Sequence, residues 1–396
     1  MKLAQLIQPL TTQEFFSDYW EKKPLVLSRQ SPDTYRELLS LDDIDRALTE
    51  MGARYPDITL ATGEKIPSSA EFTFPDGSID PVSVFKLFSK GTSIVLSNMQ
   101  RKLPKLTALC RSLTAETSIP FQTNLYLTPP RSQGFRRHYD THDVFILQIA
   151  GSKNWRIYGS PVELPARGRG YSAFKEDSGA LSDKFVLQQG DLLYMPRGWY
   201  HEAISDESTS LHVTLGANSV AWSDFLFEAF ASACLQDVSF RRSLPIGFAN
   251  PGFDVSQAKT EFLRLLDALP GKIDFESTLN AYKNELIRTQ APETRAQLFN
   301  VIEIDRLEPG SIVRKRSDLI FRFDNTADGV NLTCSNNEIL FPASARESLE
   351  YILSHDSVQV SQIPGSLDTE GKLTLAKRLV LEGLVTAHAP SPSPES

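Results

Sequence analysis

The sequence predicts a mixed fold with a mainly β core, in which a double-stranded β-helix of the jelly-roll or cupin type is followed by two accessory domains. Between residues 93 and 218, short strand-like segments alternate with Gly and Pro turns, and we expect no long helix among them. After Ser219 the apolar residues recur with a helical period, and from about residue 301 strands and capped helices are mixed. A chain of 396 residues is too long for one ordinary core.

Residues 1–92 are expected to form helices and strands that brace the barrel. Capping pairs mark two helix starts, at Thr11 with Glu14 and at Ser40 with Asp43, while Asp80 before a proline marks a third. Residues 93–218 are assigned to the barrel. Its strands are predicted from alternating or β-branched segments, namely 93–97, 123–128, 143–148, 155–158 and 211–215.

Residues 219–300 are expected to form a helical domain, because Trp222, Phe225, Leu226 and Phe230 recur at helical spacing. Residues 301–386 combine strands with two capped helices, an order compatible with a small winged-helix-like domain. The Pro- and Ser-rich tail, residues 387–396, is expected to be disordered.

Composition narrows the classes of function. The formal net charge of −8 argues against extensive nucleic-acid binding, so that any such contact would have to be local. No stretch approaches the ~20 apolar residues of a membrane span, and the N-terminus lacks a signal-peptide pattern, so we expect a cytoplasmic protein. The three cysteines are widely spaced and odd in number, which fits neither a disulfide framework nor a zinc site.

A candidate metal site lies in the segment His138-Tyr139-Asp140. Residues two apart in a strand share a face, so His138 and Asp140 could bind one ion together if this segment is a strand. A distant strand would then supply a second histidine. Two histidines and one carboxylate are typical of non-haem Fe(II) oxygenases, because the remaining coordination positions stay open for a co-substrate and dioxygen.

Three histidines compete for the role of third ligand. Along an extended strand His142 would lie roughly 13 Å from His138, too far to share its ion. His201 follows an apolar segment that enters a Pro/Gly corner, where the rim of a barrel places functional residues. His212 lies inside a predicted strand, where a hydrogen-bonded core histidine is the simpler interpretation, although a ligand role stays open. We therefore predict a catalytic metal centre of His138, Asp140 and His201.

If the co-substrate is 2-oxoglutarate, the site also needs a cation for its distal carboxylate. Lys153 follows a Gly-Ser turn at the start of the next strand, so that a hairpin could fold it over the metal. Arg156 is a competing cation, and either residue could instead be a solvated charge. Asn124, Tyr126 and Thr214 could provide hydrogen bonds if they face inward, or could be ordinary polar residues of a sheet.

Together these segments resemble the JmjC-type ribosomal oxygenases, Fe(II)- and 2-oxoglutarate-dependent hydroxylases of the cupin superfamily. The resemblance covers nearly the whole chain and is strongest over 120–216. The similar stretches are 15–25 near the N-terminus and, in the predicted barrel, 124–135, 138–140, 143–148, 151–156 and 190–198.

The resemblance implies the cofactor Fe(II), the co-substrate 2-oxoglutarate, a homodimer formed through the helical domain, and hydroxylation of an arginine or histidine side chain in a ribosomal protein. By position it implies that the iron ligands are His138, Asp140 and His201, that Lys153 binds the 2-oxoglutarate carboxylate, and that the pocket is lined by Asn124, Tyr126 and Thr214.

Two residues bear on which branch of the family the chain resembles, and they point in different directions. A lysine at position 153 is more similar to the histidine-hydroxylating branch than to the bacterial arginine-hydroxylating branch, which tends to carry arginine there. Gly216 departs from the serine that is common nearby in the histidine-hydroxylating branch.

Two other classes of function stay compatible with the sequence. A cupin-type metal-dependent oxygenase or isomerase acting on a small molecule would need neither Lys153 nor the accessory domains. A non-catalytic protein could keep the barrel to bind the ribosome or another partner, although an intact set of metal ligands argues against it.

Overall fold

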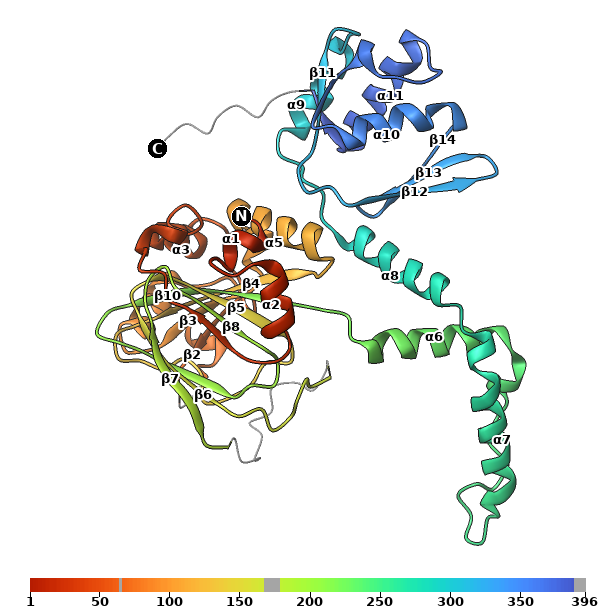
Figure 1. Ribbon diagram of the computed structural model, residues 1–396. Helices are drawn as coiled ribbons and strands as arrows, with labels where there is room; N and C mark the ends of the chain where they lie inside the picture. Colours follow the sequence, from red (N-terminus) through yellow and green to blue (C-terminus); the bar gives the residue numbers. More distant parts are fainter. Residues whose placement is uncertain (64–65, 167–178, 388–396) are drawn as a thin grey trace. The chain divides into compact units, whose positions relative to one another are not determined.

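The computed structural model describes residues 1–63, 66–166 and 179–387. The chain divides into two compact units, Met1–Ser219 and Val220–Ser396 (Figure 1). The tail that we expect to be disordered lies, apart from Ala387, outside the described residues. No helix within the three described ranges combines the length and the apolar composition that a bilayer crossing requires.

The described strands of unit 1 form two antiparallel sheets. The larger sheet has the strand order β1-β8-β5-β10-β4-β3-β2, and the smaller has the order β7-β6-β9. This is the double-stranded β-helix that the alternating segments predict. The strands are β1 (Leu25–Leu27), β2 (Ile58–Ala61), β3 (Ser93–Leu96), β4 (Phe121–Thr128), β5 (Asp143–Ala150), β6 (Lys153–Tyr158), β7 (Leu181–Leu187), β8 (Leu192–Met195), β9 (His201–Ser205) and β10 (Ser210–Ala217).

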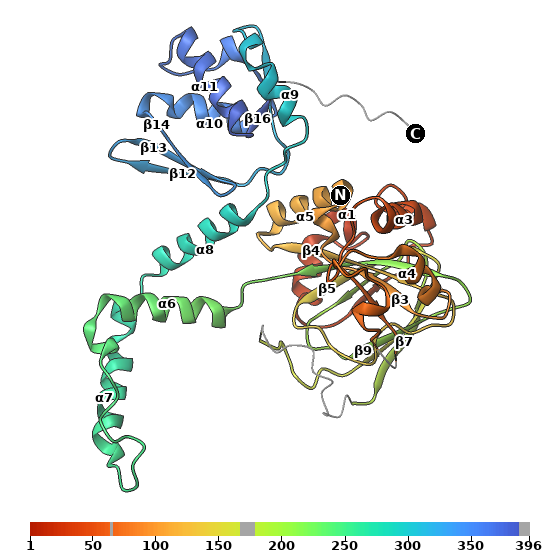
Figure 2. The same cartoon turned by 180° about the vertical axis from the view of Figure 1, so that it is seen from behind.

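Both faces of the larger sheet are buried, as β5 illustrates. Val144 and Ile146 pack with Trp155 of β6 in the space between the two sheets. The alternate residues Phe145 and Leu147 belong to a second cluster, which includes the N-terminal helices on the outer face of the sheet (Figures 1 and 2). Because successive side chains of a strand point to opposite faces, a strand covered on both sides is mostly apolar.

Local capping fixes three helix starts of unit 1, at Thr11, Ser40 and Asp80, where the sequence predicts them. The backbone N–H of Glu14 donates to Thr11 Oγ1 at 3.2 Å, and the N–H of Thr11 donates to Glu14 Oε2 at 2.8 Å. Ser40 and Asp43 form the same reciprocal pair. The helices are α1 (Leu3–Leu6), α2 (Thr12–Asp18), α3 (Leu41–Thr49), α4 (Pro81–Phe88) and α5 (Pro104–Thr117).

Helix α5 corrects the expectation that the barrel segment contains no long helix. It begins at Pro104, a residue favoured at the first helical position, and buries Leu106, Leu109 and Leu113 at helical spacing. These leucines belong to the same cluster as the outer face of the large sheet. The helical period was present in the sequence, but it was short and lay between strong strand signals.

Unit 2 begins with four helices, as the period after Ser219 predicts: α6 (Trp222–Gln236), α7 (Val255–Ala268), α8 (Phe275–Thr289) and α9 (Gln297–Ile302). Two three-stranded sheets follow, with the orders β15-β11-β16 and β12-β13-β14. The predicted domain boundaries and the winged-helix-like assignment stay predictions. The remaining elements are β11 (Ile312–Lys315), β12 (Phe321–Thr326), β13 (Gly329–Cys334), β14 (Asn337–Phe341), α10 (Arg346–Ser354), β15 (Ser357–Gln359), α11 (Thr369–Leu381) and β16 (Val385–Thr386).

Candidate metal centre

The two histidines of the candidate site, distant in the sequence, lie side by side. His138 forms an isolated β-bridge with His201, the first residue of β9. The N–H of His138 donates to the carbonyl of His201 at 3.1 Å, and the N–H of His201 donates to the carbonyl of His138 at 2.8 Å. His138 and Asp140 do not lie in a continuous strand, because the segment pairs with β9 at this single residue.

His138, Asp140 and His201 can offer their donor atoms to a common point. One candidate ligand atom from each residue lies within 4.8 Å of the other two, and His201 Nε2 is 3.9 Å from Asp140 Oδ2. The imidazole rings of the two histidines are 4.5 Å apart between centroids. The tertiary structure therefore brings together the three residues that the sequence predicted as ligands.

Backbone carbonyls orient both imidazoles. His138 Nδ1 is 2.7 Å from the carbonyl oxygen of Arg136, and His201 Nδ1 is 3.0 Å from that of Trp199. Because a carbonyl oxygen can only accept a hydrogen bond, each Nδ1 must carry the proton. Each Nε2 then carries the lone pair, and this tautomer is the form of histidine that binds a metal through Nε2.

Burial and neighbouring groups set the ionisation of the site. Burial, together with the adjacent His138, lowers the pKa of His201 to about 4, so this imidazole is neutral near pH 7. Burial disfavours the ionised form of Asp140, but the His138 and His201 imidazoles outweigh it and place the pKa of this carboxyl below its ordinary value. Two imidazoles and one carboxylate form a donor set that fits Fe(II) or a similar divalent ion.

The three residues line a cavity whose other lining residues include polar groups suited to an organic anion. The cavity has a volume of about 240 Å³. Val144, Ile146 and Trp155 give it apolar walls. Its polar lining outside the candidate metal ligands includes Ser93, Tyr126, Thr128, Lys153, His212 and Thr214.

Lys153 is the buried cation of this cavity. Its side chain is 4% exposed, and Nζ donates to Thr128 Oγ1 at 3.0 Å and lies 3.4 Å from His212 Nδ1. Within the described residues it forms no ion pair, and burial lowers its pKa to about 7. A buried ammonium without a carboxylate partner is costly, so this environment suits an anionic ligand such as one carboxylate of 2-oxoglutarate.

The other predicted residues divide into those that reach the cavity and those that do not. Tyr126 and Thr214 line it, whereas Asn124 is absent from its described lining and accepts a hydrogen bond from the backbone N–H of Asn98 at 3.1 Å. Asn124 also hydrogen-bonds with Tyr126, so it contacts the pocket through that residue. The competing cation Arg156 instead forms an ion pair of 3.4 Å with Glu202.

His212 and His142 lie near the centre but outside the described ligand group. His212 stacks on the ring of Tyr126 with 4.8 Å between centroids. The ring of His142 lies against Gly216, where a Cβ atom would approach it to 2.7 Å. The interpretation of His212 as a buried, hydrogen-bonded histidine therefore agrees with its contacts.

Thr128 is a cavity residue that the sequence reasoning missed. It lies two residues after Tyr126 on β4, and alternate residues of a strand share a face. The same alternation that paired Asn124 with Tyr126 would have found it. The sequence placed Trp155 on a predicted strand but did not place it at the site. Its ring lies 5.8 Å from that of the candidate ligand His201, between centroids, because β6 pairs with β9 in the smaller sheet.

Comparison with known proteins gives a family model and several curated relatives. The JmjC domain model matches residues 95–225. The bifunctional lysine-specific demethylase and histidyl-hydroxylase NO66 of Drosophila persimilis is 39% identical over 217 residues, which cover 54% of this chain and 31% of that protein. Ribosomal oxygenase 1 of Danio rerio is 33% identical over 254 residues, with coverages of 61% and 46%. The chain spans less than half the length of these relatives.

Solved structures share the fold over almost the whole chain. The Escherichia coli ribosomal oxygenase YcfD matches with a TM-score of 0.55 and 19% identity, covering 96% of this chain and 98% of that one. A structure of YcfD in complex with cobalt and 2-oxoglutarate matches with a TM-score of 0.55 and 18% identity, with coverages of 95% and 98%. Residues 95–225 thus match the JmjC domain, and the chain is similar to ribosomal oxygenases in sequence and shares the fold of YcfD over almost its whole length.

Proposed function

We propose that the protein is an Fe(II)- and 2-oxoglutarate-dependent oxygenase that hydroxylates an arginine or histidine side chain of a ribosomal protein. The observation that carries this proposal is one cavity lined both by the group His138, Asp140 and His201 and by the buried ammonium of Lys153. The names of the relatives, which include histidyl-hydroxylase and ribosomal oxygenase, support the same class of reaction.

Each residue has a role that its environment supports. His138 and His201 would bind Fe(II) through Nε2, and Asp140 would bind it through a carboxylate oxygen. Lys153 and the Thr128 hydroxyl would bind the distal carboxylate of 2-oxoglutarate, with Tyr126, Thr214 and, behind them, Asn124 completing the polar surroundings. The apolar walls of the cavity would exclude water from the reacting groups.

Iron and its co-substrate supply the oxidative chemistry when bound: 2-oxoglutarate is cleaved to succinate and carbon dioxide, and the two atoms of dioxygen enter succinate and a C–H bond of the target side chain. The protein contributes position and shielding. The His201 imidazole, neutral near pH 7, requires no deprotonation before it binds the metal, and the Lys153 ammonium compensates the charge of a buried carboxylate.

The test is to compare intact masses of ribosomal proteins from cells with and without this gene. We expect one ribosomal protein to differ by a single oxygen atom, and tandem mass spectrometry to locate it on arginine or histidine. Purified protein should form succinate from 2-oxoglutarate in step with this hydroxylation. Succinate-independent turnover of a small molecule, with no mass change on any ribosomal protein, would instead support the cupin-type alternative.

We also propose that unit 2 forms a homodimer through its helices, and that the protein works in the cytoplasm, where ribosomes are reached directly. Many large apolar side chains of these helices and their connections are exposed in the single chain. Single apolar residues on a surface are common, but this number of them indicates an interaction surface. They include Trp222 (73%), Phe227 (69%), Leu235 (74%), Phe248 (60%) and Phe262 (58%).

Light scattering of the full chain tests the dimer. We expect a dimeric mass for the wild type and a smaller mass for Phe227→Glu, because a charge in a buried apolar contact is costly. Leu340→Glu is the matched control, since Leu340 is 56% exposed but lies on β14 rather than on the helices. A monomeric wild type would contradict the proposal.

A further inference from the structure

We propose that Arg197 and Asp143 are positioning residues for the metal centre, and that Glu21 extends their ion pair into a brace that holds two ligand-bearing segments in register. Glu21, Asp143 and Arg197 are called the brace below. The inference rests on the proposed function, since it assumes that His138, Asp140 and His201 bind a metal. It adds residues that neither coordinate this metal nor line the described cavity.

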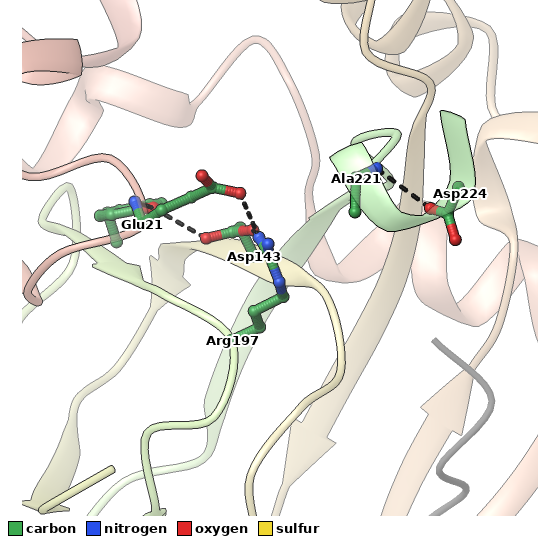
Figure 3. A network of polar contacts seen from close by, with 6 residues as sticks. Glu21, Asp143, Arg197, Ala221 and Asp224 are labelled. Carbon is green, nitrogen blue, oxygen red and sulfur yellow. Dashed lines mark hydrogen bonds and ion pairs between the residues drawn. The ribbon is translucent and has the colours of Figure 1, made fainter. Parts of the chain in front are cut away.

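The brace is a buried network with one cation and two carboxylates. Arg197 Nη1 donates to Asp143 Oδ2 at 2.8 Å and also to a carboxylate oxygen of Glu21 (Figure 3). The side chain of Asp143 is fully buried and that of Arg197 is 11% exposed. Tyr194 donates its hydroxyl hydrogen to Asp143 Oδ1 at 2.9 Å and accepts the backbone N–H of Glu21 at 2.9 Å.

The position of the brace in the chain connects it to the ligands. Asp143 begins β5, three residues after Asp140, while Arg197 lies in the turn between β8 and β9, four residues before His201. The two segments are joined a second time by the backbone, where the N–H of Gly198 donates to the carbonyl of Asp140 at 2.9 Å. One side-chain contact and one backbone contact thus fix the separation of the Asp140 and His201 segments.

The turn between β8 and β9 has a constrained backbone, so it has little freedom to adjust when the Arg197–Asp143 ion pair is removed. Gly198 has a φ of +90°, and a Cβ there would lie 2.3 Å from the carbonyl oxygen of Val162. The backbone therefore passes this point in a conformation that few other residues adopt. Arg197 is the adjacent residue, so its contact with Asp143 sets how the turn enters β9 and presents His201.

Stability alone is a weak reason for such a network. Replacing a buried ion pair with apolar residues of similar size is often neutral or stabilising, whereas removing one partner leaves an uncompensated charge. Metal sites, by contrast, depend on ligand positions held by surrounding groups, and losing such an outer group commonly weakens metal binding by about 10- to 100-fold. A role in ligand geometry therefore explains why charges are kept at this position.

Glu21 shows that residues before the JmjC-matched segment take part. It lies outside residues 95–225, in the connection between α2 and β1, and has a positive φ of 58°. β1 pairs with β8, the strand that precedes Arg197. The N-terminal region is thereby attached to the metal-site turn through both a strand pair and a charge.

The experiment measures Co(II) binding by the full chain, using the visible absorption of the bound ion and its dissociation constant. Asp143→Asn and Arg197→Lys should weaken Co(II) binding by about 10- to 100-fold and alter the absorption spectrum. Glu21→Gln should have a smaller effect in the same direction, because this carboxylate is one-third exposed. Arg131→Gln is the matched control: it breaks an exposed ion pair with Glu207 and should change neither quantity.

A double variant distinguishes an effect on the position of the metal ligands from a general loss of folding. Asp143→Leu with Arg197→Met removes both charges of the buried pair and leaves only the one-third-exposed carboxylate of Glu21, so it should fold even where the single variants are unstable. We expect this folded protein, checked by circular dichroism, still to bind Co(II) more weakly than the wild type. Wild-type affinity and spectrum in the double variant would overturn the brace. Failure of the wild type to bind Co(II), or binding unaffected by His201→Ala, would instead overturn the proposed metal centre and the inference with it.

Discussion

The Lys153 ammonium nitrogen lies 3.0 Å from the hydroxyl oxygen of Thr128, inside the cavity that the metal ligands also line. Its other polar neighbour is the imidazole of His212, and within the described residues no carboxylate pairs with it. A buried charge without a counter-ion destabilises the ligand-free protein and favours an anionic ligand. The cavity is therefore organised for binding at a cost in stability.

Replacing Lys153 should reveal how much its buried charge destabilises the ligand-free protein. We expect Lys153→Met to raise the free energy of unfolding of the ligand-free protein by about 0.5–2 kcal/mol, as substitutions at strained functional positions commonly do. The same variant should lose 2-oxoglutarate binding while keeping metal binding. Urea unfolding and calorimetric titration provide the measurements. Lys184→Met, at an exposed position of β7, should change none of them; a destabilised Lys153→Met protein would contradict the prediction.

The affinity for 2-oxoglutarate should depend on pH. Burial lowers the pKa of Lys153 to about 7 from its ordinary value of 10.5, and only the ammonium form pairs with a carboxylate. As pH rises above about 7, the metal-loaded protein should bind 2-oxoglutarate up to tenfold more weakly per pH unit and take up a proton on binding. Lys153→Arg should remove this dependence, because guanidinium stays protonated. Equal pH profiles for both proteins would refute the assignment.

The same pKa shift has a defined effect on stability. Between about pH 7 and 10.5 the unfolded chain keeps the proton on Lys153 while the folded, ligand-free protein loses it. Because the unfolded state binds more protons in this window, the contribution of Lys153 makes the folded protein more stable as pH rises. Below about pH 7 the full destabilising effect of the buried charge is present. Lys153→Met should flatten this part of the stability profile.

The two candidate distant histidines should behave differently. We expect His201→Ala to abolish both Co(II) binding and succinate formation, because its Nε2 is one of only three donors in the described group. His212→Ala should keep Co(II) binding and mainly weaken 2-oxoglutarate binding, since His212 contacts Lys153. Isothermal titration with each ligand separates these effects. Retained metal binding in His201→Ala, with loss in His212→Ala, would reverse the assignment.

The contact between Gly216 and His142 predicts a coupled pair. A side chain at 216 would approach the His142 ring to 2.7 Å, so Gly216→Ser should lower the free energy of unfolding by about 1–3 kcal/mol. Combining it with His142→Ala should recover part of that loss, which a double-mutant cycle of unfolding free energies measures. Gly159→Ser, where no atom lies within 4 Å of the added Cβ, is the control. Additive effects in the cycle would contradict the contact.

Local signals predicted much of the fold because they act over a few residues. The capping pairs at Thr11 and Ser40 placed helix starts correctly, since each cap depends on a residue three positions away. Strand alternation located β4, β6 and β10 for the same reason. Helix α5 was missed because its apolar residues follow a helical period over only a short segment between predicted strands. Strands β7 and β9 were not predicted because they lack a strong alternating pattern.

For the candidate site, local sequence patterns indicate the chemistry: which side chains can coordinate an ion, that His138 and Asp140 are close neighbours in the chain, and that Lys153 begins a strand. The tertiary structure decided the rest. It placed His201 beside His138 through one bridge, brought Thr128 to the Lys153 ammonium, and joined Arg197 to Asp143. These are contacts between residues far apart in the chain, so they depend on sheet order and register, which no local pattern specifies.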